Sequence, residues 1–265
     1  MLKVNEQTVT YQDGIRLKDL TEAYKPGADI FIVNGFPASP DTVLANGDTC
    51  CLIRRGEIPT EKEMESLLVS RHTPGVHKAV KKATVGIMGL GGLGTVVAGA
   101  LVRIGVGKLI LVDFDVVEPS NLNRQQYSIS QIGEKKTEAL KKNLLQINPY
   151  ITIKTVDGLL TEESIPQVFR NVDVLAECFD GPEMKAAALR TVLTNMIGTG
   201  YVGSSGLAGF GDNNAIRTKK IHDNVYIIGD GTSAAGPGQG LMAPRVGIAA
   251  HHQANQILHI LLGKD

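Results

Sequence analysis

Cysteine and aromatic residues are scarce in this chain, and tryptophan is absent. Only 3 cysteines occur in 265 residues, aromatic residues make up 5%, and two of the cysteines, Cys50 and Cys51, are adjacent. Three cysteines cannot build a disulfide framework, and the sequence has no Cys-x-x-Cys pair. A structural zinc site of that type is therefore not expected.

Excess charge and long apolar runs are missing as well. The 27 Lys and Arg residues balance the 27 Asp and Glu residues, so composition gives no electrostatic reason to expect DNA or a membrane surface as a partner. No apolar run approaches the ~20 residues of a membrane span. The first residues also lack the apolar stretch of a secretory signal. These absences predict a cytoplasmic globular protein.

Residues 1–58 have the pattern of a small domain of their own. The β-prone runs are 2–4, 8–11, 30–33 and 50–54, and the helical run is 17–24. This ββαββ order predicts a small β-grasp domain. Thr60 and Glu63 form a capping box that predicts a helix from about residue 61. That helix belongs to a helical linker over 59–80, and residues 70–75 have the pattern of a helix stop.

From residue 81 onward, strand and helix patterns alternate. The expected strands are 84–88, 109–112, 151–155 and 172–177, and the expected helices are 93–104, 134–147, 183–196 and 245–262. A hairpin is expected around 216–228, between glycine-rich loops at 198–211 and 229–240. The alternation predicts an α/β fold with a Rossmann-like, doubly wound and mainly parallel sheet.

Residues 85–94 have the pattern of a nucleotide-binding turn. Gly89 is expected to make the tight turn, Gly91 to let phosphates approach the backbone, and Gly94 to let the helix lie close to its strand. Asp113 ends the next strand, 19 residues after Gly94, where a carboxylate can bind a ribose diol. Dehydrogenases share this pattern, so the turn alone predicts only a nucleotide-binding βαβ unit.

The residues after Asp113 indicate ATP rather than NAD. Asn121, Arg124 and Lys136 carry an amide, a guanidinium and an ammonium, which are the groups that bind phosphate oxygens. Lys136 begins an expected helix whose amides can hold the same anion. Asp180 follows an expected strand at the edge where open α/β sheets bind ligands, and its carboxylate suits Mg²⁺ on a triphosphate. The series predicts an enzyme that cleaves ATP between the α- and β-phosphates.

These motifs resemble the ThiF/MoeB/HesA branch of the ubiquitin-activating superfamily. The resemblance covers about residues 68–265 and rests on Gly-x-Gly-Gly-Leu-Gly, Leu-Val-Asp-Phe-Asp, Ser-Asn-Leu-Asn-Arg-Gln, Gly-x-x-Lys and Cys-x-Asp. In that family the C-terminal glycine carboxylate of a carrier protein attacks the α-phosphate of ATP, giving an acyl-adenylate and pyrophosphate. The resemblance implies an ATP-binding adenylyltransferase domain at 81–265. The implied ATP site is Gly89, Gly91, Gly92, Asp113, Asp115, Asn121, Arg124 and Lys136, with Asp180 holding Mg²⁺.

Arg71, in Ser-Arg-His, resembles the arginine that family dimers lend to the neighbouring subunit's ATP site. A homodimer with shared ATP sites is therefore expected, and Arg71 joins Arg124, Lys136 and Asp180 as the predicted catalytic set. The chain lacks the zinc-binding cysteine pairs of some relatives and has no cysteine in 182–240, where others carry one that receives the activated carrier. Cys178 is expected to be buried structure, so the resemblance implies adenylation without a thioester.

The N-terminal segment resembles the small sulfur-carrier proteins of the ThiS/MoaD type, through residues 29–35, 44–48 and the apolar strand that follows. Those carriers end in a Gly-Gly tail whose carboxylate reacts. Here a single glycine, Gly56, is followed by Glu57, and the chain continues. An internal peptide carbonyl cannot be activated as a free carboxylate. The segment is therefore expected to be a carrier mimic or a docking module.

The function expected from the sequence is adenylylation of a ThiS-like sulfur carrier, in thiamine biosynthesis. Three alternatives stay open. The same ATP chemistry could serve a dehydratase that acts on a modified tRNA nucleoside, although the neutral net charge does not favour RNA. An NAD-dependent dehydrogenase would use Asp113 but leave Arg124 and Lys136 without a role. A non-catalytic scaffold would use residues 1–58 to block its own carrier site.

Overall fold

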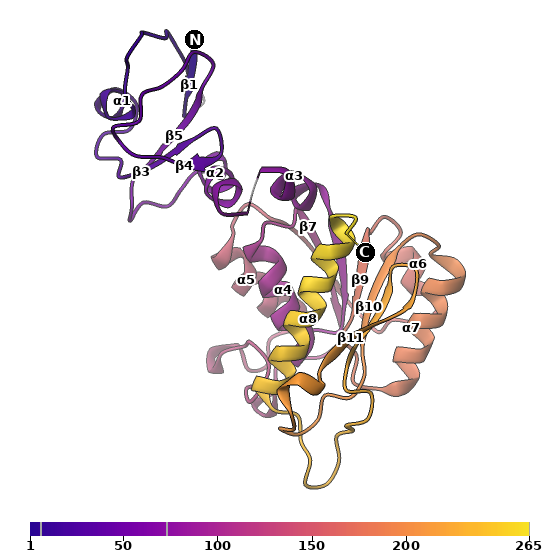
Figure 1. Cartoon of the computed structure of the whole chain (residues 1–265). Helices are drawn as coiled ribbons and strands as arrows, with labels where there is room; N and C mark the ends of the chain where they lie inside the picture. The colour runs from indigo at the N-terminus through magenta and orange to yellow at the C-terminus, as the bar shows by residue number, and fades with distance from the viewer. Residues whose placement is uncertain (6, 73, 265) are drawn as a thin grey trace. The chain divides into compact units, whose positions relative to one another are not determined.

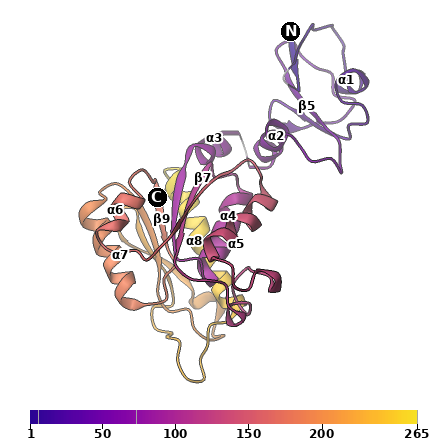
Figure 2. The same ribbon diagram turned by 180° about the vertical axis from the view of Figure 1, so that it is seen from behind.

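The computed structural model describes residues 1–5, 7–72 and 74–264, and it divides into two compact units, Met1–Lys78 and Ala79–Asp265. Figures 1 and 2 show the elements from opposite sides. Each unit is built on its own β-sheet. Among the described helices, none has both the length and the apolar character needed to cross a bilayer.

The first unit is a five-stranded sheet in the order β2-β1-β5-β3-β4. Its elements are β1 (Leu2–Val4), β2 (Gln7–Val9), α1 (Leu17–Tyr24), β3 (Ile30–Val33), β4 (Phe36–Pro37), β5 (Thr49–Ile53) and α2 (Glu61–His72). The central pair β1 and β5 is parallel, and the other pairs are antiparallel. This is the small β-grasp domain that the sequence predicts.

Helices α1 and α2 cover opposite faces of this sheet. Successive residues of a strand point to opposite faces. Cys50 packs in one cluster with Leu20 of α1, whereas Cys51 packs in another with Leu67 of α2. The predicted capping box is present, since the Thr60 amide donates to the Glu63 carboxylate at 2.9 Å and the Glu63 amide to the Thr60 hydroxyl at 3.3 Å. Helix α2 is thus an integral part of this unit.

The second unit is a seven-stranded sheet in the order β11-β12-β10-β9-β6-β7-β8. The strands are β6 (Thr84–Met88), β7 (Lys108–Asp113), β8 (Thr152–Asp157), β9 (Val174–Glu177), β10 (Gly200–Ser204), β11 (Arg217–His222) and β12 (Val225–Gly229). Only the β11–β12 pairing is antiparallel among these described strands. The mainly parallel, doubly wound sheet is therefore confirmed.

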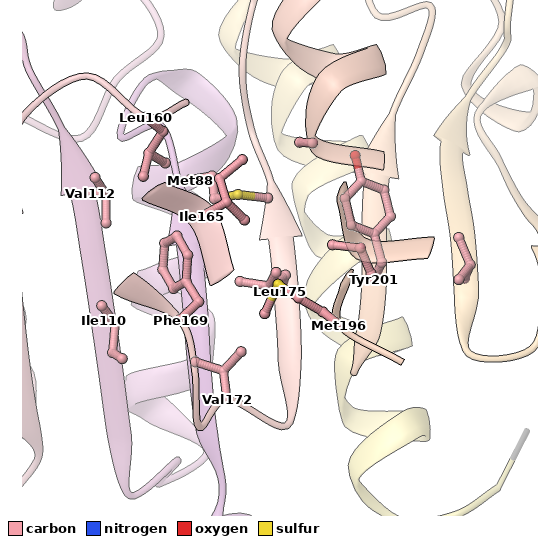
Figure 3. Close-up of a cluster of buried hydrophobic side chains, with 13 residues drawn as sticks. Met88, Ile110, Val112, Leu160, Ile165, Phe169, Val172, Leu175, Met196 and Tyr201 are labelled. Carbon is pink, nitrogen blue, oxygen red and sulfur yellow. The ribbon is translucent and has the colours of Figure 1, made fainter. Parts of the chain in front are cut away.

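Helices cover both faces of this sheet (Figures 1 and 2). They are α4 (Gly92–Arg103), α5 (Lys136–Ile147), α6 (Ser164–Val168), α7 (Pro182–Asn195) and α8 (Ala243–Leu261), with short 3-10 turns η1 (Pro119–Asn121), η2 (Ile129–Gln131) and η3 (Asn213–Ala215). Figure 3 shows one core, in which Phe169 lies between Ile110 and Leu175 of the sheet. A Cβ on Gly86 would lie 2.5 Å from the Phe169 ring, so this glycine makes room for it.

One local expectation was wrong, and two helices were not expected. Strand β10 lies within the expected loop 198–211. Its glycines suggest a loop in the sequence, but in the fold they allow close packing against α8, since a Cβ on Gly200 would come within 3.0 Å of Ile260. The expected helix stop at 70–75 is confirmed, since α2 ends at His72. A further helix, α3 (Pro74–Lys82), begins within the same stretch, because proline is well tolerated at the first position of a helix. Thr73 lies outside the described residues. Helix α6 was not expected at all.

Candidate nucleotide site

The glycine turn joins β6 to α4 as the sequence predicts. Gly89 has φ 89°, in the left-handed region that favours glycine. A Cβ on Gly89 would lie 2.8 Å from the Cys178 carbonyl oxygen, and one on Gly94 would lie 2.0 Å from the Gly89 carbonyl oxygen. Gly91 occupies the N-cap position, and α4 begins at Gly92. The close approach of backbones therefore requires glycine at 89 and 94, and it leaves the helix N-terminus uncovered by side chains of its own.

Asp113 lies beside this turn at the end of β7. One carboxylate oxygen accepts the Leu90 amide at 2.6 Å, and the other accepts the Asp115 amide at 2.8 Å. Each carboxylate oxygen has a second lone pair. The carboxylate is thus fixed in direction while it keeps acceptor capacity for a diol.

Lys136 and Asp115 form an ion pair next to Asp113. The Lys136 ammonium lies 2.7 Å from Asp115 Oδ2, and the Lys136 amide donates to the Asp115 carbonyl at 3.0 Å. Lys136 is only 6% exposed. Lys136 begins α5. The amides of residues 136, 138 and 139 already donate to the carbonyls of Asp115 and Lys135, so they are not free for an anion as the sequence suggests.

Tyr127 connects these two segments and was not singled out from the sequence. Its buried hydroxyl lies 2.9 Å from the Leu90 carbonyl and 3.4 Å from the Lys136 carbonyl. Burial, followed by the negative charges of Asp113 and Asp115, raises the pKa of Tyr127 far above its usual range. The hydroxyl therefore keeps its proton and holds the glycine turn near the start of α5.

Arg124 lies over the N-terminus of α4. A Cβ on Gly92 would be 3.4 Å from both Cγ and the carbonyl oxygen of Arg124. Arg124 is half-buried as a residue, and its guanidinium donates to the Asn123 side chain at 2.8 Å and to the Ser120 carbonyl at 3.3 Å. Both are neutral acceptors, so an arriving anion does not have to displace a carboxylate.

Asn121 and Gln125 shape the loop that carries Arg124. The Asn121 side-chain oxygen accepts the Glu118 amide at 3.0 Å, and the backbone carbonyl of Asn121 accepts the amides of Arg124 and Gln125 at 3.1 and 2.9 Å. In this structure Asn121 therefore organises the loop. Gln125 is 7% exposed, its Oε1 has no hydrogen-bond partner among the described residues, and its Nε2 is 3.7 Å from the Cβ position on Gly91. A buried amide whose oxygen is unpaired, beside open glycine backbone, suits a ligand site.

Asp180 is exposed in the turn between β9 and α7. This turn neighbours the glycine turn through the contact between Cys178 and Gly89. Glu177 holds the shape of the turn that carries Asp180. It is 1% exposed, and its carboxylate accepts the Phe179 amide at 2.7 Å and the Lys185 ammonium at 2.9 Å. Glu177 and Lys185 were not singled out from the sequence, because their roles depend on this folded turn.

A single carboxylate at Asp180 fits the way Mg²⁺ binds together with substrate phosphates. Among the described residues there is no cluster of three or more His, Cys, Asp or Glu side chains that could hold a metal by itself. Arg71 lies on α2 and is exposed. Arg71 belongs to the first unit. The other candidate residues all belong to the second unit.

Comparison with known families gives the same architecture. Residues 65–265 match the ThiF family, and residues 1–56 match the ThiS-like ubiquitin family. The chain belongs to the ThiF family. The resemblance inferred from the motifs is therefore confirmed for both parts of the chain.

Several curated relatives are similar over part of their length. A molybdopterin-synthase adenylyltransferase of Haemophilus influenzae is 38% identical over 107 residues, which are 40% of this chain and 44% of the relative. The adenylyltransferase and sulfurtransferase UBA4 of Candida glabrata is 30% identical over 69% of this chain and 43% of its own length. A tRNA threonylcarbamoyladenosine dehydratase of Haemophilus influenzae is 31% identical over 51% of this chain and 52% of its own. The matched stretches thus span about half of these relatives or less.

Among solved structures, the E. coli tRNA N6-threonylcarbamoyladenosine dehydratase in complex with ATP superimposes with a TM-score of 0.69 at 20% identity. The match covers 78% of this chain and 98% of that one. At this identity the similarity establishes the fold alone.

Proposed function

We propose that this chain uses ATP to adenylylate the C-terminal glycine carboxylate of a ThiS-like sulfur carrier, in thiamine biosynthesis. The observation that carries the proposal is the convergence of Asp113, Arg124 and Lys136 around the glycine turn at one edge of the sheet. A dehydrogenase has no use for the two cations. Membership of a family whose relatives include adenylyltransferases supports the same chemistry.

In the proposed reaction, a carboxylate oxygen of the carrier attacks the α-phosphorus of ATP. The bond from the α-phosphorus to the bridging oxygen breaks, and pyrophosphate leaves with the electron pair. Asp113 holds the ribose, while Arg124 and Lys136 neutralise negative charge on the phosphates as it shifts to the leaving group. Asp180 would hold Mg²⁺, which supplies further charge neutralisation on the phosphate oxygens.

Carrier-dependent exchange of labelled pyrophosphate into ATP tests this function. The purified chain is incubated with a ThiS-like protein that ends in Gly-Gly, and a carrier that lacks the last glycine serves as the control. Exchange only with the intact carrier is the expected result. Absence of exchange with every sulfur carrier tried would remove the proposal.

A second candidate is ATP-dependent dehydration of a modified tRNA nucleoside. It is favoured by the similarity to the Haemophilus influenzae dehydratase. The balanced charge of the chain argues against it, since no excess of Lys and Arg is present to bind RNA phosphates. ATP hydrolysis stimulated by tRNA, with no stimulation by carriers, would select this candidate.

We further propose that the β-grasp unit is a carrier mimic and not a substrate. After β5 the chain turns back: the Arg55 amide donates to Asp29 at 2.8 Å, and Arg54 pairs with Glu57 at 3.4 Å. A carrier tail has to extend freely to reach an active site, whereas this segment is tied down before it leads into α2. Mass spectrometry after incubation with ATP should accordingly find no AMP adduct on residues 1–58.

The homodimer with shared sites is also a proposal, and complementation tests it. Arg71→Ala and Lys136→Met chains are each expected to be inactive as homodimers. If Arg71 serves the partner's site, a mixed dimer regains one intact site and therefore about half of the activity per dimer. No recovery in verified mixed dimers would mean that Arg71 does not act across subunits.

Adenylation without a thioester is expected because Cys178 is buried and unreactive. Burial, and then the neighbouring Glu177 carboxylate, raise the pKa of the Cys178 thiol, so the thiolate is scarce. A Cys178→Ser variant should keep full pyrophosphate exchange and full transfer to the sulfur donor. Loss of transfer with exchange intact would instead assign a covalent role to this thiol.

A further inference from the structure

A buried ion pair joins the two glycine-rich loops of the second unit. Arg245, in the first turn of α8, is 5% exposed. Its Nη1 donates to the carbonyls of Gly211 and Asp212 at 3.0 Å each, and its Nη2 donates to Asp230 at 2.7 Å. One guanidinium thus holds the loop after β10, the loop after β12 and the start of α8 together.

Asp230 is itself organised by its loop. Its carboxylate accepts the amides of Thr232 and Ser233 at 2.8 and 2.7 Å and the Ser233 hydroxyl. Burial alone would raise the pKa of Asp230, but the hydrogen bonds from Ser233, Thr232 and Arg245 outweigh it and hold the pKa well below its usual range. The carboxylate is therefore ionised at neutral pH.

The two loops touch through glycine. A Cβ on Gly206 would lie 2.1 Å from Asp230 Oδ1, and one on Gly229 would lie 1.8 Å from the Ser205 carbonyl oxygen. Both glycines also have positive φ, at 80° and 138°. The backbones of the two loops are consequently in close contact, and the ion pair between Arg245 and Asp230 holds them in place.

This assembly lies at the edge of the sheet that carries the nucleotide site. Strands β6, β9, β10 and β12 run parallel, so the loops that follow them meet at one edge. Val246, the residue after Arg245, lies 3.0 Å from the Cβ position on Gly92. The loops after β10 and β12 lie past β9, on the side of β6 away from β7. A carboxylate held by these loops would approach a nucleotide bound over β6 and β7 from that side.

We propose that Arg245, paired with Asp230, positions the two glycine-rich loops to receive the second substrate, an extended peptide tail ending in a carboxylate. This inference rests on the proposed adenylation of a carrier. Arg245 acts through the loops and does not touch the nucleotide. Removing Arg245 should therefore raise the KM of the carrier and leave the affinity for ATP unchanged. An ion pair that only stabilised the fold would affect both quantities or neither.

Arg245→Met, Arg245→Lys and Asp230→Asn chains, with a ThiS-like carrier, test the proposal. Removing the guanidinium should raise the carrier KM about 10- to 100-fold, because loops that are no longer held in place lose binding contacts with the tail. ATP affinity, measured by calorimetry, should stay within about twofold. The carrier KM of Arg245→Lys should lie between those of the wild type and Arg245→Met, because an ammonium can keep the pair with Asp230 but not both carbonyl contacts. Arg190→Met, which removes an exposed ion pair with Glu162, is the matched control and should alter neither quantity.

Equal losses of carrier and ATP affinity in all three variants, or no change in either, would overturn the inference. If Arg245→Met does not fold, Arg245→Lys and Asp230→Asn give the same comparison with less disturbance. A wild-type chain that is inactive with every carrier defeats the proposed function, and this inference with it. An active wild type whose variants keep the carrier KM defeats this inference alone.

Discussion

The Lys136 ammonium lies 2.7 Å from Asp115 Oδ2, and the two side chains differ in exposure, at 7% for the lysine and 47% for the aspartate. The lysine is fixed by buried surroundings, while its partner faces solvent. A phosphate can therefore take over part of the pairing without moving the lysine, and the site needs little rearrangement when a nucleotide binds.

Lys136→Met should lower pyrophosphate exchange by about 10²–10³-fold, the effect of removing one preorganised charge from a reaction of this type. The neighbouring Lys135 is the matched control, because its ammonium is half-exposed and pairs with Asp157 at 3.2 Å. Lys135→Met should leave exchange within about twofold of the wild type, since exposed pairs contribute little. Similar losses in both variants would mean that overall charge, and not position, controls the rate.

Tyr127→Phe should remove the hydroxyl that links the glycine turn to the start of α5. The change removes one hydroxyl and leaves the Leu90 carbonyl without its 2.9 Å partner, at a cost of about 1–2 kcal/mol in unfolding free energy. We expect ATP affinity to fall about tenfold, because the turn and Lys136 lose their fixed spacing. Urea denaturation and calorimetry on one preparation measure both effects. A loss of stability with unchanged ATP affinity would reduce Tyr127 to a core residue.

The nucleotide-binding βαβ unit could be predicted because its signals are local. Strand β6 was predicted with its observed bounds, since a short run of apolar residues followed by glycines identifies a buried strand and its turn. Strand β10 could not be predicted, because two of its five residues are glycines that serve contacts made only in the folded chain.

The candidate site likewise contains residues that the sequence identifies and residues whose roles appear only in the folded chain. Arg124 and Lys136 are recognisable by residue type and order. Tyr127 acts through Leu90, 37 residues away, and Arg245 through Asp230, 15 residues away. Nothing adjacent in the sequence indicates these partners, so such roles appear only when packing brings the segments together.

Acid stability should depend on Asp230. The pKa of Asp230 is lower in the folded chain than in the unfolded one, so its ionised form stabilises the fold above the unfolded value of about 3.8–3.9. As the pH falls below that value, the unfolded chain takes up the proton first and stability decreases. Asp230→Asn should be less stable than the wild type at pH 7, and its stability should fall less steeply below pH ~4. Parallel wild-type and variant curves of unfolding free energy against pH would contradict this.

Helix α2 should shield one face of the β-grasp sheet, and the two adjacent cysteines report on it. Cys51 packs under Leu67 of α2, whereas Cys50 packs on the opposite face. Burial, then the charges of Asp48 and Cys51, raise the pKa of Cys50 to about 11. Leu67→Ala should cost about 1–2 kcal/mol, below the range for fully buried leucine because Leu67 is only partly buried.

The decisive measurement is the rate at which each thiol reacts with a maleimide at pH 7.5, followed by peptide mass spectrometry. We expect Leu67→Ala to speed labelling of Cys51 and to leave Cys50 unchanged, because only one sheet face is uncovered. Val9→Ala, on the Cys50 side, is the matched control and should not accelerate Cys51. Equal acceleration of both thiols by Leu67→Ala would indicate that the whole unit opens, and α2 would then be a general stabiliser and not a cover for one face.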